Sequence, residues 1–82
     1  MYELDDLNMD EAVLKQYSGE EEKITISAKI DNKKIVSVGA FAFSEHREIV
    51  EITLPETVVS IGAHAFYNCR NLASITLYDT VT

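Results

Sequence analysis

Cysteine, proline, glycine and tryptophan are scarce in this 82-residue chain, which has one Cys, one Pro, three Gly and no Trp. The single cysteine, Cys69, excludes an internal disulfide framework and a cysteine-rich zinc site. The low Pro and Gly content excludes a collagen-like chain. No apolar run approaches the ~20 residues that a membrane-spanning helix needs, so the sequence predicts no membrane insertion.

The residues that are present are typical of one small globular domain. Hydrophobic residues make up 46% of the chain and charged residues 26%, which differs from a disordered chain. A chain this short buries only about 60% of its unfolded surface, so we expect marginal stability. Residues 1–6 lack the basic and apolar segments of a signal peptide. If Met1 is the native start, we expect a cytoplasmic protein; if a leader has been removed, we expect a secreted or cell-surface one.

Acidic residues are concentrated near the N-terminus. Residues 1–22 contain eight Asp or Glu and one Lys, whereas residues 23–82 contain six acidic and six basic residues. The first segment therefore carries the whole net charge of -7, which would repel nucleic acids and anionic lipids. Two interpretations stay open for it: a solvated, solubilising end piece, or a docking surface for a basic partner.

A residue pattern recurs after 23 positions. Val36 to Phe43 aligns with Val59 to Phe66, with Ser, Gly, Ala and Phe in the same places. The alignment continues downstream, where Ile49, Ile52, Thr53 and Leu54 match Leu72, Ile75, Thr76 and Leu77, and Thr57-Val58 matches Thr80-Val81. So many matches at one shift indicate internal repeats.

A degenerate third copy precedes these two repeats. Ile24 to Ile26 resembles Ile52 to Leu54, but the segment that follows is five residues longer. Asp31-Asn32 provides a suitable turn within this insertion. The last repeat is expected to be incomplete, because the chain ends at Thr82 in the middle of the pattern.

The spacing of apolar residues predicts stacked coils. Leu72, Ile75 and Leu77 stand at positions 1, 4 and 6 of a repeat, which is the leucine-rich repeat spacing. Alternate strand residues face the same way, so Ile75 and Leu77 should point into the core. The glycines at equivalent positions, Gly39 and Gly62, are predicted at tight bends where a side chain would clash. The Ala-x-Ala-Phe segments are predicted as helical turns that place their Phe in the core.

The stretch from Ser60 to Leu77, Ser-Ile-Gly-x-x-Ala-Phe-x-x-Cys-x-x-Leu-x-x-Ile-x-Leu, resembles the BspA-like leucine-rich repeat. The resemblance covers about residues 12–82. It implies an α+β repeat solenoid, a right-handed superhelix of short strands and helical turns. In this interpretation residues 1–22 form an acidic N-terminal cap and residues 23–82 form leucine-rich repeats of period 23. Members of the family are bacterial and protistan proteins, many of them at the cell surface, so the resemblance implies binding of host or matrix proteins.

The structure of the N-terminal cap is ambiguous in the sequence. Residues 10–16 have a helix-forming composition. Residues 2–4 could instead pair with residues 13–17 as a hairpin, and the resemblance favours this alternative. The end of a solenoid exposes core residues, so a polar cap is needed there in either case.

Outward-facing strand positions form the candidate binding face. Thr25, Thr53 and Thr76 fall in one column, with Lys23, Glu51 and Ser74 in the next and Ser27, Pro55 and Tyr78 in a third. Threonine columns also favour strand pairing, so structural and recognition roles both stay open. The predicted protein-binding face consists of Thr25, Glu51, Thr53, Ser74, Thr76 and Tyr78, with Tyr78 as the expected hot spot.

Candidate chemistry centres on two equivalent positions, His46 and Cys69. A Cys beside a His can become an activated nucleophile, but this position is a core position of the repeat, where a buried thiol is inert. His64 lies between two alanines without a neighbouring ligand residue, so it is a poor metal site and is expected to make surface contacts. We therefore expect no catalytic residue, no cofactor and no metal.

Two functions remain open at this point: a non-catalytic protein-protein interaction module of a longer array, with a possible role in adhesion, or a structural capping segment without binding of its own. An uncovered strand edge around Leu72, Ile75 and Leu77 is also expected. Such edges pair with other chains, so self-association or a frayed C-terminus is predicted.

Overall fold

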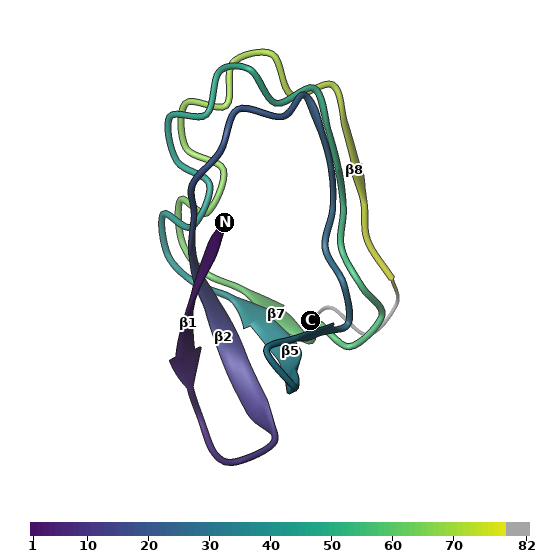
Figure 1. The fold of residues 1–82 in the computed structure, drawn as a ribbon. Coiled ribbons are helices and arrows are strands. Elements are labelled where there is room, and N and C mark those ends of the chain that lie inside the picture. The colour runs from purple at the N-terminus through teal and green to yellow at the C-terminus, as the bar shows by residue number, and fades with distance from the viewer. Residues whose placement is uncertain (79–82) are drawn as a thin grey trace.

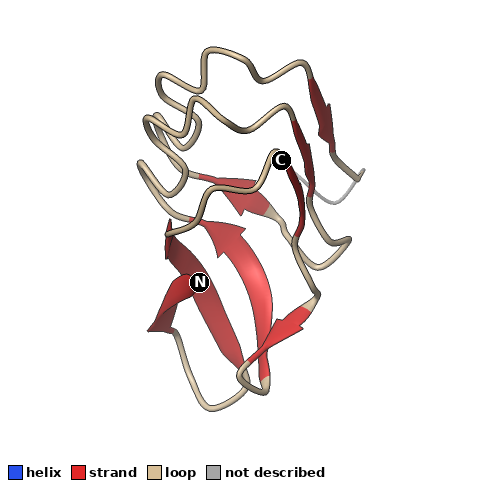
Figure 2. Cartoon of the chain, turned by 45° about the horizontal axis from the view of Figure 1, so that its top comes forward, coloured by secondary structure: helices blue, strands red, loops and turns tan. Residues whose placement is uncertain are grey.

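The computed structural model describes residues 1–78, which form short strands joined by turns (Figures 1 and 2). The strands are β1 (Tyr2–Asp6), β2 (Glu11–Tyr17), β3 (Lys23–Thr25), β4 (Lys29–Ile30), β5 (Lys33–Val38), β6 (Glu51–Thr53), β7 (Ser60–Ile61) and β8 (Ser74–Thr76). One sheet has the order β1-β2-β5-β4, with β7 also paired to β5, and the other has the order β3-β6-β8. The expected repeat matches at Thr80 and Val81 and the expected fraying of the C-terminus concern residues outside this range.

Successive coils of the chain lie over one another in Figure 1, with β8 on the right, and β5 and β7 beside β2 in the lower half of the view. Each coil passes from a strand of the three-stranded sheet to a strand of the five-stranded sheet and then through turns. The parallel pairs β3–β6 and β6–β8 align Ile24, Ile52 and Ile75. Strand pairing therefore confirms the register that the repeat alignment predicts for this sheet.

The prediction of helical turns is wrong for the described residues. Segments 40–45 and 63–68 form turns, and no helix occurs in residues 1–78. Phe41 (φ 59°) and Glu45 (φ 63°) have left-handed backbone, and the same conformation returns 23 residues later at His64 (φ 55°) and Asn68 (φ 59°). A right-handed helix cannot pass through left-handed residues four positions apart. The fold is therefore a mainly β solenoid and not the predicted α+β solenoid.

Hydrogen bonds between coils explain why the turns do not close into helices. The backbone N–H of Phe43 donates to the carbonyl of Ala65 in the next coil at 2.8 Å, and the N–H of Glu45 donates to the carbonyl of Tyr67 at 2.6 Å. A helix would direct these N–H groups along its own axis. The stacked coils satisfy them from the neighbouring coil instead.

Gly39 and Gly62 are needed for close approach between coils. Neither glycine has a positive φ. A Cβ at Gly62 would lie 2.5 Å from the backbone nitrogen of Ala40, and a Cβ at Gly39 would lie 3.1 Å from the carbonyl oxygen of Leu14. The predicted clash is therefore present at Gly62, where the clashing atoms belong to the preceding coil, whereas a Cβ at Gly39 would make a tight contact with strand β2.

The insertion predicted after Ile26 is a small hairpin. Strands β4 and β5 pair antiparallel across Asp31 and Asn32, which have φ angles of 51° and 67°. Two consecutive left-handed residues are the signature of a type I′ turn, which suits Asp and Asn. The turn prediction at Asp31-Asn32 is confirmed.

The N-terminal segment contains the antiparallel hairpin β1–β2. In its connection, the side-chain oxygen of Asn8 accepts hydrogen bonds from the backbone N–H groups of Asp10 and Glu11, both at 2.9 Å. Strand β2 then pairs in parallel with β5, and its Ala12, Leu14 and Tyr17 belong to the core. The division into a cap of residues 1–22 and an array of residues 23–82 stays a prediction.

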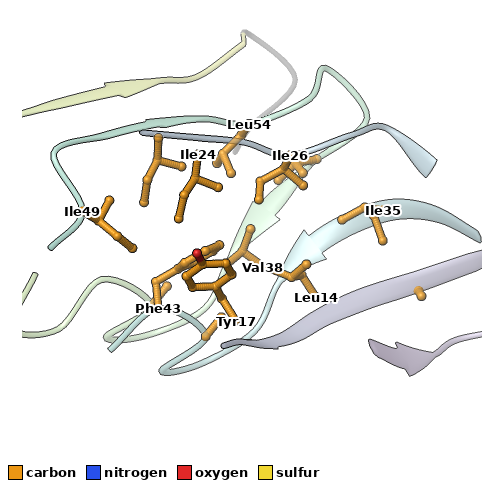
Figure 3. Packing of buried hydrophobic residues seen from close by; sticks show 14 residues of the cluster. Leu14, Tyr17, Ile24, Ile26, Ile35, Val38, Phe43, Ile49 and Leu54 are labelled. Carbon is orange, nitrogen blue, oxygen red and sulfur yellow. The ribbon is translucent and has the colours of Figure 1, made fainter. Parts of the chain in front are cut away.

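The core lies between the two sheets and the turns (Figure 3). It consists of Ala12, Leu14, Tyr17, Ile24, Ile26, Ile35, Val38, Ala42, Phe43, Ile49, Ile52, Leu54, Val58 and Ala65. Aromatic rings stack from coil to coil, with centroids 5.5 Å apart for Tyr17 and Phe43, both in the core, and 5.6 Å apart for Phe43 and Phe66, which is half-buried and packs against the core. We call these three residues the aromatic ladder. Phe43 thus joins the coils on both sides.

We predict that Phe43→Ala unfolds most of the protein, because Phe43 is fully buried. Removing a buried Phe costs about 3–5 kcal/mol, which is comparable to the whole stability of a domain of this size. The matched control is Phe41→Ala, because Phe41 is 51% exposed and its loss should change stability by about 0.5 kcal/mol or less. Urea unfolding followed by circular dichroism measures both. Similar midpoints for the two variants would contradict the described core.

Candidate interaction surfaces

The predicted binding face is the outer side of the three-stranded sheet. Two of the predicted columns lie within the strands: strand pairing aligns Lys23 with Glu51 and Ser74, and Thr25 with Thr53 and Thr76. Between these two columns, Ile24 and Ile52 point inward and are buried. Since side chains alternate along a strand, the structure places the two predicted columns together on the surface.

The third predicted column lies beyond the strand ends. Ser27 is exposed, Pro55 is half-buried and Tyr78 is 45% exposed. The backbone N–H of Leu54 still donates to the carbonyl of Thr76 at 3.1 Å. The two coils therefore stay hydrogen-bonded as far as Leu54, the residue before Pro55. The structure describes no strand pairing among the three column residues themselves.

The chemistry of this face is mainly that of hydroxyl groups. The two columns within the strands hold three Thr and one Ser. Their two charged side chains, Lys23 and Glu51, are of opposite sign and lie at paired positions. The acidic segment Glu20–Glu22 borders the face, because the carbonyl of Glu22 accepts the backbone N–H of Val50 at 2.7 Å. The face is therefore polar and nearly neutral, with an acidic boundary at one edge.

A second exposed surface, which we call the aromatic rim, consists of Phe41, His64 and Tyr67. Their ring centroids lie 5.2 Å apart for Phe41 and His64, 5.7 Å for His64 and Tyr67, and 6.2 Å for Phe41 and Tyr67. Phe41 and Tyr67 are about half exposed, and His64 is exposed. The repeat alignment could have placed His64 beside Phe41, but the prediction of helical turns concealed the contact with Tyr67.

His46 and Cys69 have corresponding structural contacts. The Nε2 atom of His46 lies 3.0 Å from the carbonyl oxygen of Tyr17, and its Nδ1 lies 2.8 Å from the Glu48 carboxylate. The thiol of Cys69 donates to the carbonyl of Phe43 at 2.9 Å. Tyr17 and Phe43 are successive members of the aromatic ladder. Both side chains therefore tie one coil to the carbonyl of the preceding ladder residue.

Burial raises the pKa of the Cys69 thiol, and the negative charge of Glu48 raises it further. A hydrogen bond from the His46 backbone lowers the pKa, but the net pKa stays above its ordinary value. A thiol that stays protonated is a poor nucleophile, because the thiolate is the reactive form. The geometry therefore gives Cys69 a structural contact, and its raised pKa disfavours the reactive thiolate.

Residues 1–78 contain no group of three or more His, Cys, Asp or Glu residues placed to hold a metal ion, and they enclose no pocket. None of their segments forms a helix with the length and apolar character needed to cross a membrane. The features that these residues do offer are the polar sheet face and the aromatic rim.

We predict that Cys69 of the folded protein reacts with iodoacetamide at neutral pH several-fold more slowly than Cys69 of the urea-unfolded chain. Partial burial limits access, and the raised pKa lowers the thiolate fraction. Mass spectrometry of quenched time points gives both rates. Faster alkylation in the folded state would instead indicate an activated thiol.

Comparison with known proteins agrees with this architecture. The family described as "BspA type Leucine rich repeat region (6 copies)" matches residues 16–82. A search of curated proteins gives no match. Among solved structures, a leucine-rich repeat protein of T. pallidum is 32% identical with a TM-score of 0.88 over 99% of this chain.

Two further solved structures are similar. A leucine-rich repeat protein from Bacteroides capillosus is 26% identical over 98% of this chain, with a TM-score of 0.87. A leucine-rich cell surface protein from Faecalibacterium prausnitzii is 30% identical over 96% of this chain, with a TM-score of 0.82. The chain spans only 37%, 63% and 22% of the T. pallidum, B. capillosus and F. prausnitzii chains. Its repeat pattern, its stacked coils and the match over residues 16–82 show that the chain belongs to the BspA-type leucine-rich repeat family.

Proposed function

We propose that this chain is a non-catalytic protein-binding segment of a leucine-rich repeat array. The proposed contact surface is the predicted face of Thr25, Glu51, Thr53, Ser74, Thr76 and Tyr78. The observation that carries the proposal is the parallel register of β3, β6 and β8, which aligns the side chains of three coils in rows. Repeat proteins use such extended surfaces for binding.

The composition of the face suits recognition of a polar protein surface. Threonine and serine are short side chains, so little rotamer freedom is lost when they are covered. Tyr78 supplies a large apolar area with a hydroxyl group, and about half of it is exposed. Tyr is a frequent hot spot in protein interfaces, so Tyr78 is the proposed anchor of the contact.

An adhesive role extends this proposal. It is supported by the similarity to the F. prausnitzii protein, which is described as a leucine-rich cell surface protein. The competing proposal is structural: the segment completes and solubilises the end of an array, and binding occurs elsewhere. The exposed acidic residues of β1, Glu3, Asp5 and Asp6, support that alternative, because charges on an edge strand discourage pairing with other chains.

We predict that Tyr78→Ala weakens binding to a protein partner about 30-fold or more, as expected for a hot spot. A panel of purified extracellular-matrix proteins provides the probes, and biolayer interferometry measures saturable binding to each. Thr76→Arg should weaken the same binding, because it places a long charged side chain in the centre of the face. Both variants should keep the urea midpoint of the parent chain.

Tyr67→Ala is the matched control, because Tyr67 and Tyr78 are almost equally exposed but belong to different surfaces. It should bind like the parent chain. Loss of binding in Tyr67→Ala alone would move the contact to the aromatic rim and overturn the proposed face. Unchanged affinity in all three variants would favour the structural alternative.

We further propose that the outer edge of β8 pairs with a second copy of the chain. Within the described residues, Ile75 and Leu77 are 38% and 49% exposed, although their alignment with Ile52 and Leu54 predicts core positions. Strand β8 is also the last strand of its sheet order. An unpaired edge with exposed apolar side chains favours pairing with another strand.

We predict a concentration-dependent increase in mass for the isolated chain, measured by multi-angle light scattering between micromolar and millimolar concentrations. Ile75→Thr combined with Leu77→Gln should reduce this association, because both substitutions remove apolar area from the edge. A parent chain that stays monomeric over the whole range would contradict the proposed pairing.

A further inference from the structure

We propose that His46 is a proton-operated latch between the N-terminal hairpin and the first full coil of the repeat array. The latch is closed when the imidazole carries a proton on both ring nitrogens, and one of its two hydrogen bonds is lost when the ring becomes neutral. It would make the attachment of the hairpin dependent on pH, independently of which molecule the sheet face binds.

The latch joins segments that are far apart in the sequence. His46 lies in the turn before β6, whereas Tyr17 is the last residue of β2. The Nε2 atom of His46 is 3.0 Å from the carbonyl oxygen of Tyr17. The two rings are also in contact, with centroids 4.9 Å apart and an interplanar angle of 58°. Tyr17 is fully buried, so this contact anchors the end of the hairpin to the core.

The donor inventory requires a doubly protonated ring. A backbone carbonyl and a carboxylate can only accept hydrogen bonds, and a neutral imidazole has one N–H group. The Nε2 atom of His46 faces the carbonyl of Tyr17, and its Nδ1 faces the Glu48 carboxylate at 2.8 Å. Both bonds can therefore exist together only in the imidazolium form.

The groups around the ring favour that form. Glu48 supplies a negative charge from the same turn, with about a third of its side chain exposed. Burial tends to raise the pKa of Glu48, but hydrogen bonds from its own backbone and from His46, together with the charge of His46, lower the pKa below its ordinary value. The aromatic face of Tyr17 also attracts a cation. The Glu48 carboxyl is therefore held in its ionised form, as an acceptor for the ring.

The remaining titratable groups near the latch come from the neighbouring segments. From the next coil, the Cys69 thiol lies close enough to interact with the His46 backbone and the Glu48 charge. From the loop after β2, the backbone of Glu21 lies 3.4 Å from the Tyr17 hydroxyl. From β1, the Tyr2 ring packs against Tyr17 with centroids 5.3 Å apart, and just before β1 the Met1 ammonium donates to the carbonyl of Ser18 at 2.6 Å.

The next coil makes the equivalent contact with a neutral donor. There the Cys69 thiol donates to the carbonyl of Phe43, the ladder residue that follows Tyr17. The raised pKa of Cys69 keeps this thiol protonated. The two junctions therefore share one geometry, but the first uses an imidazole, a side chain that exists in a neutral and a charged form. His46→Cys transfers the neutral contact to the first junction and provides a test.

The direction of the pH effect follows from these bonds. The two-bond contact needs a proton on both ring nitrogens, so the stabilisation by the latch belongs to the protonated ring and is lost when a proton leaves, which rising pH favours. Its acidic limit is set by Glu48, whose lowered pKa means that its stabilising contribution is lost only as pH falls through that lowered value. The latch should therefore be closed in mildly acidic solution.

Thermal unfolding of the 82-residue chain at about pH 5.5 and about pH 8.5, on either side of the range in which histidine changes charge, tests the proposal. The melting temperature should fall by about 4–8 °C between the two values. His64→Gln is the control and should show the same fall as the parent chain. His64 is exposed, and its ring contacts Phe41 and Tyr67, which are not part of the latch. His46→Cys should lose most of this fall in melting temperature. Both proteins contain the Met1 ammonium, so its contribution is the same in both and does not affect the comparison. An equal fall in His46→Cys would overturn the latch.

Nitrogen-15 NMR of the parent chain tests the same proposal if His46→Cys does not fold. At the acidic value both ring nitrogens of His46 should show attached protons, and at the alkaline value only one. The backbone amide signals around Tyr17 should shift with this change, while those around Phe66 should not. A ring with a single attached proton at the acidic value, or unchanged signals around Tyr17, would overturn the proposal.

Discussion

The close stacking of successive coils is the constraint on which the rest of this structure depends. Parallel strands in the three-stranded sheet fix the distance between coils at the strand spacing of about 4.8 Å. The glycines of the turns must then lie against the backbone of the preceding coil, where a Cβ of Gly62 would be 2.5 Å from the nitrogen of Ala40. The same spacing stacks Tyr17, Phe43 and Phe66 as a continuous ladder.

Stacking also decides how polar groups of the turns are satisfied. Backbone N–H groups in the turns donate to carbonyls of the next coil, as Phe43 does to Ala65, and the side chains of His46 and Cys69 reach back to the preceding one. These bonds compensate for left-handed backbone at residues such as Phe41 and His64, a conformation that is unfavourable for large side chains. Local strain in each turn is therefore tolerated because it is offset between coils.

The N-terminal hairpin shares this core and does not sit apart from it. Strand β2 pairs in parallel with β5, and its Ala12, Leu14 and Tyr17 are buried with residues of the repeats. At its end, the contact of Tyr17 with His46 repeats the geometry that Phe43 and Cys69 have one coil later. The hairpin thus occupies the place of a preceding coil. This explains how a chain with only two recognisable repeats buries a continuous apolar core.

The sequence by itself determined the repeat period, the strand positions of the three-stranded sheet, the register of Thr25, Thr53 and Thr76, and the turn at Asp31-Asn32. These follow from periodic side-chain types and from residues with strong local preferences. Only the tertiary structure decided that the Ala-x-Ala-Phe segments are not helical, that Phe41, His64 and Tyr67 share a surface, and that His46 meets Tyr17. The physical reason is that these features depend on hydrogen bonds and ring contacts between coils. The residues of one segment do not indicate which residues of a neighbouring coil will contact them.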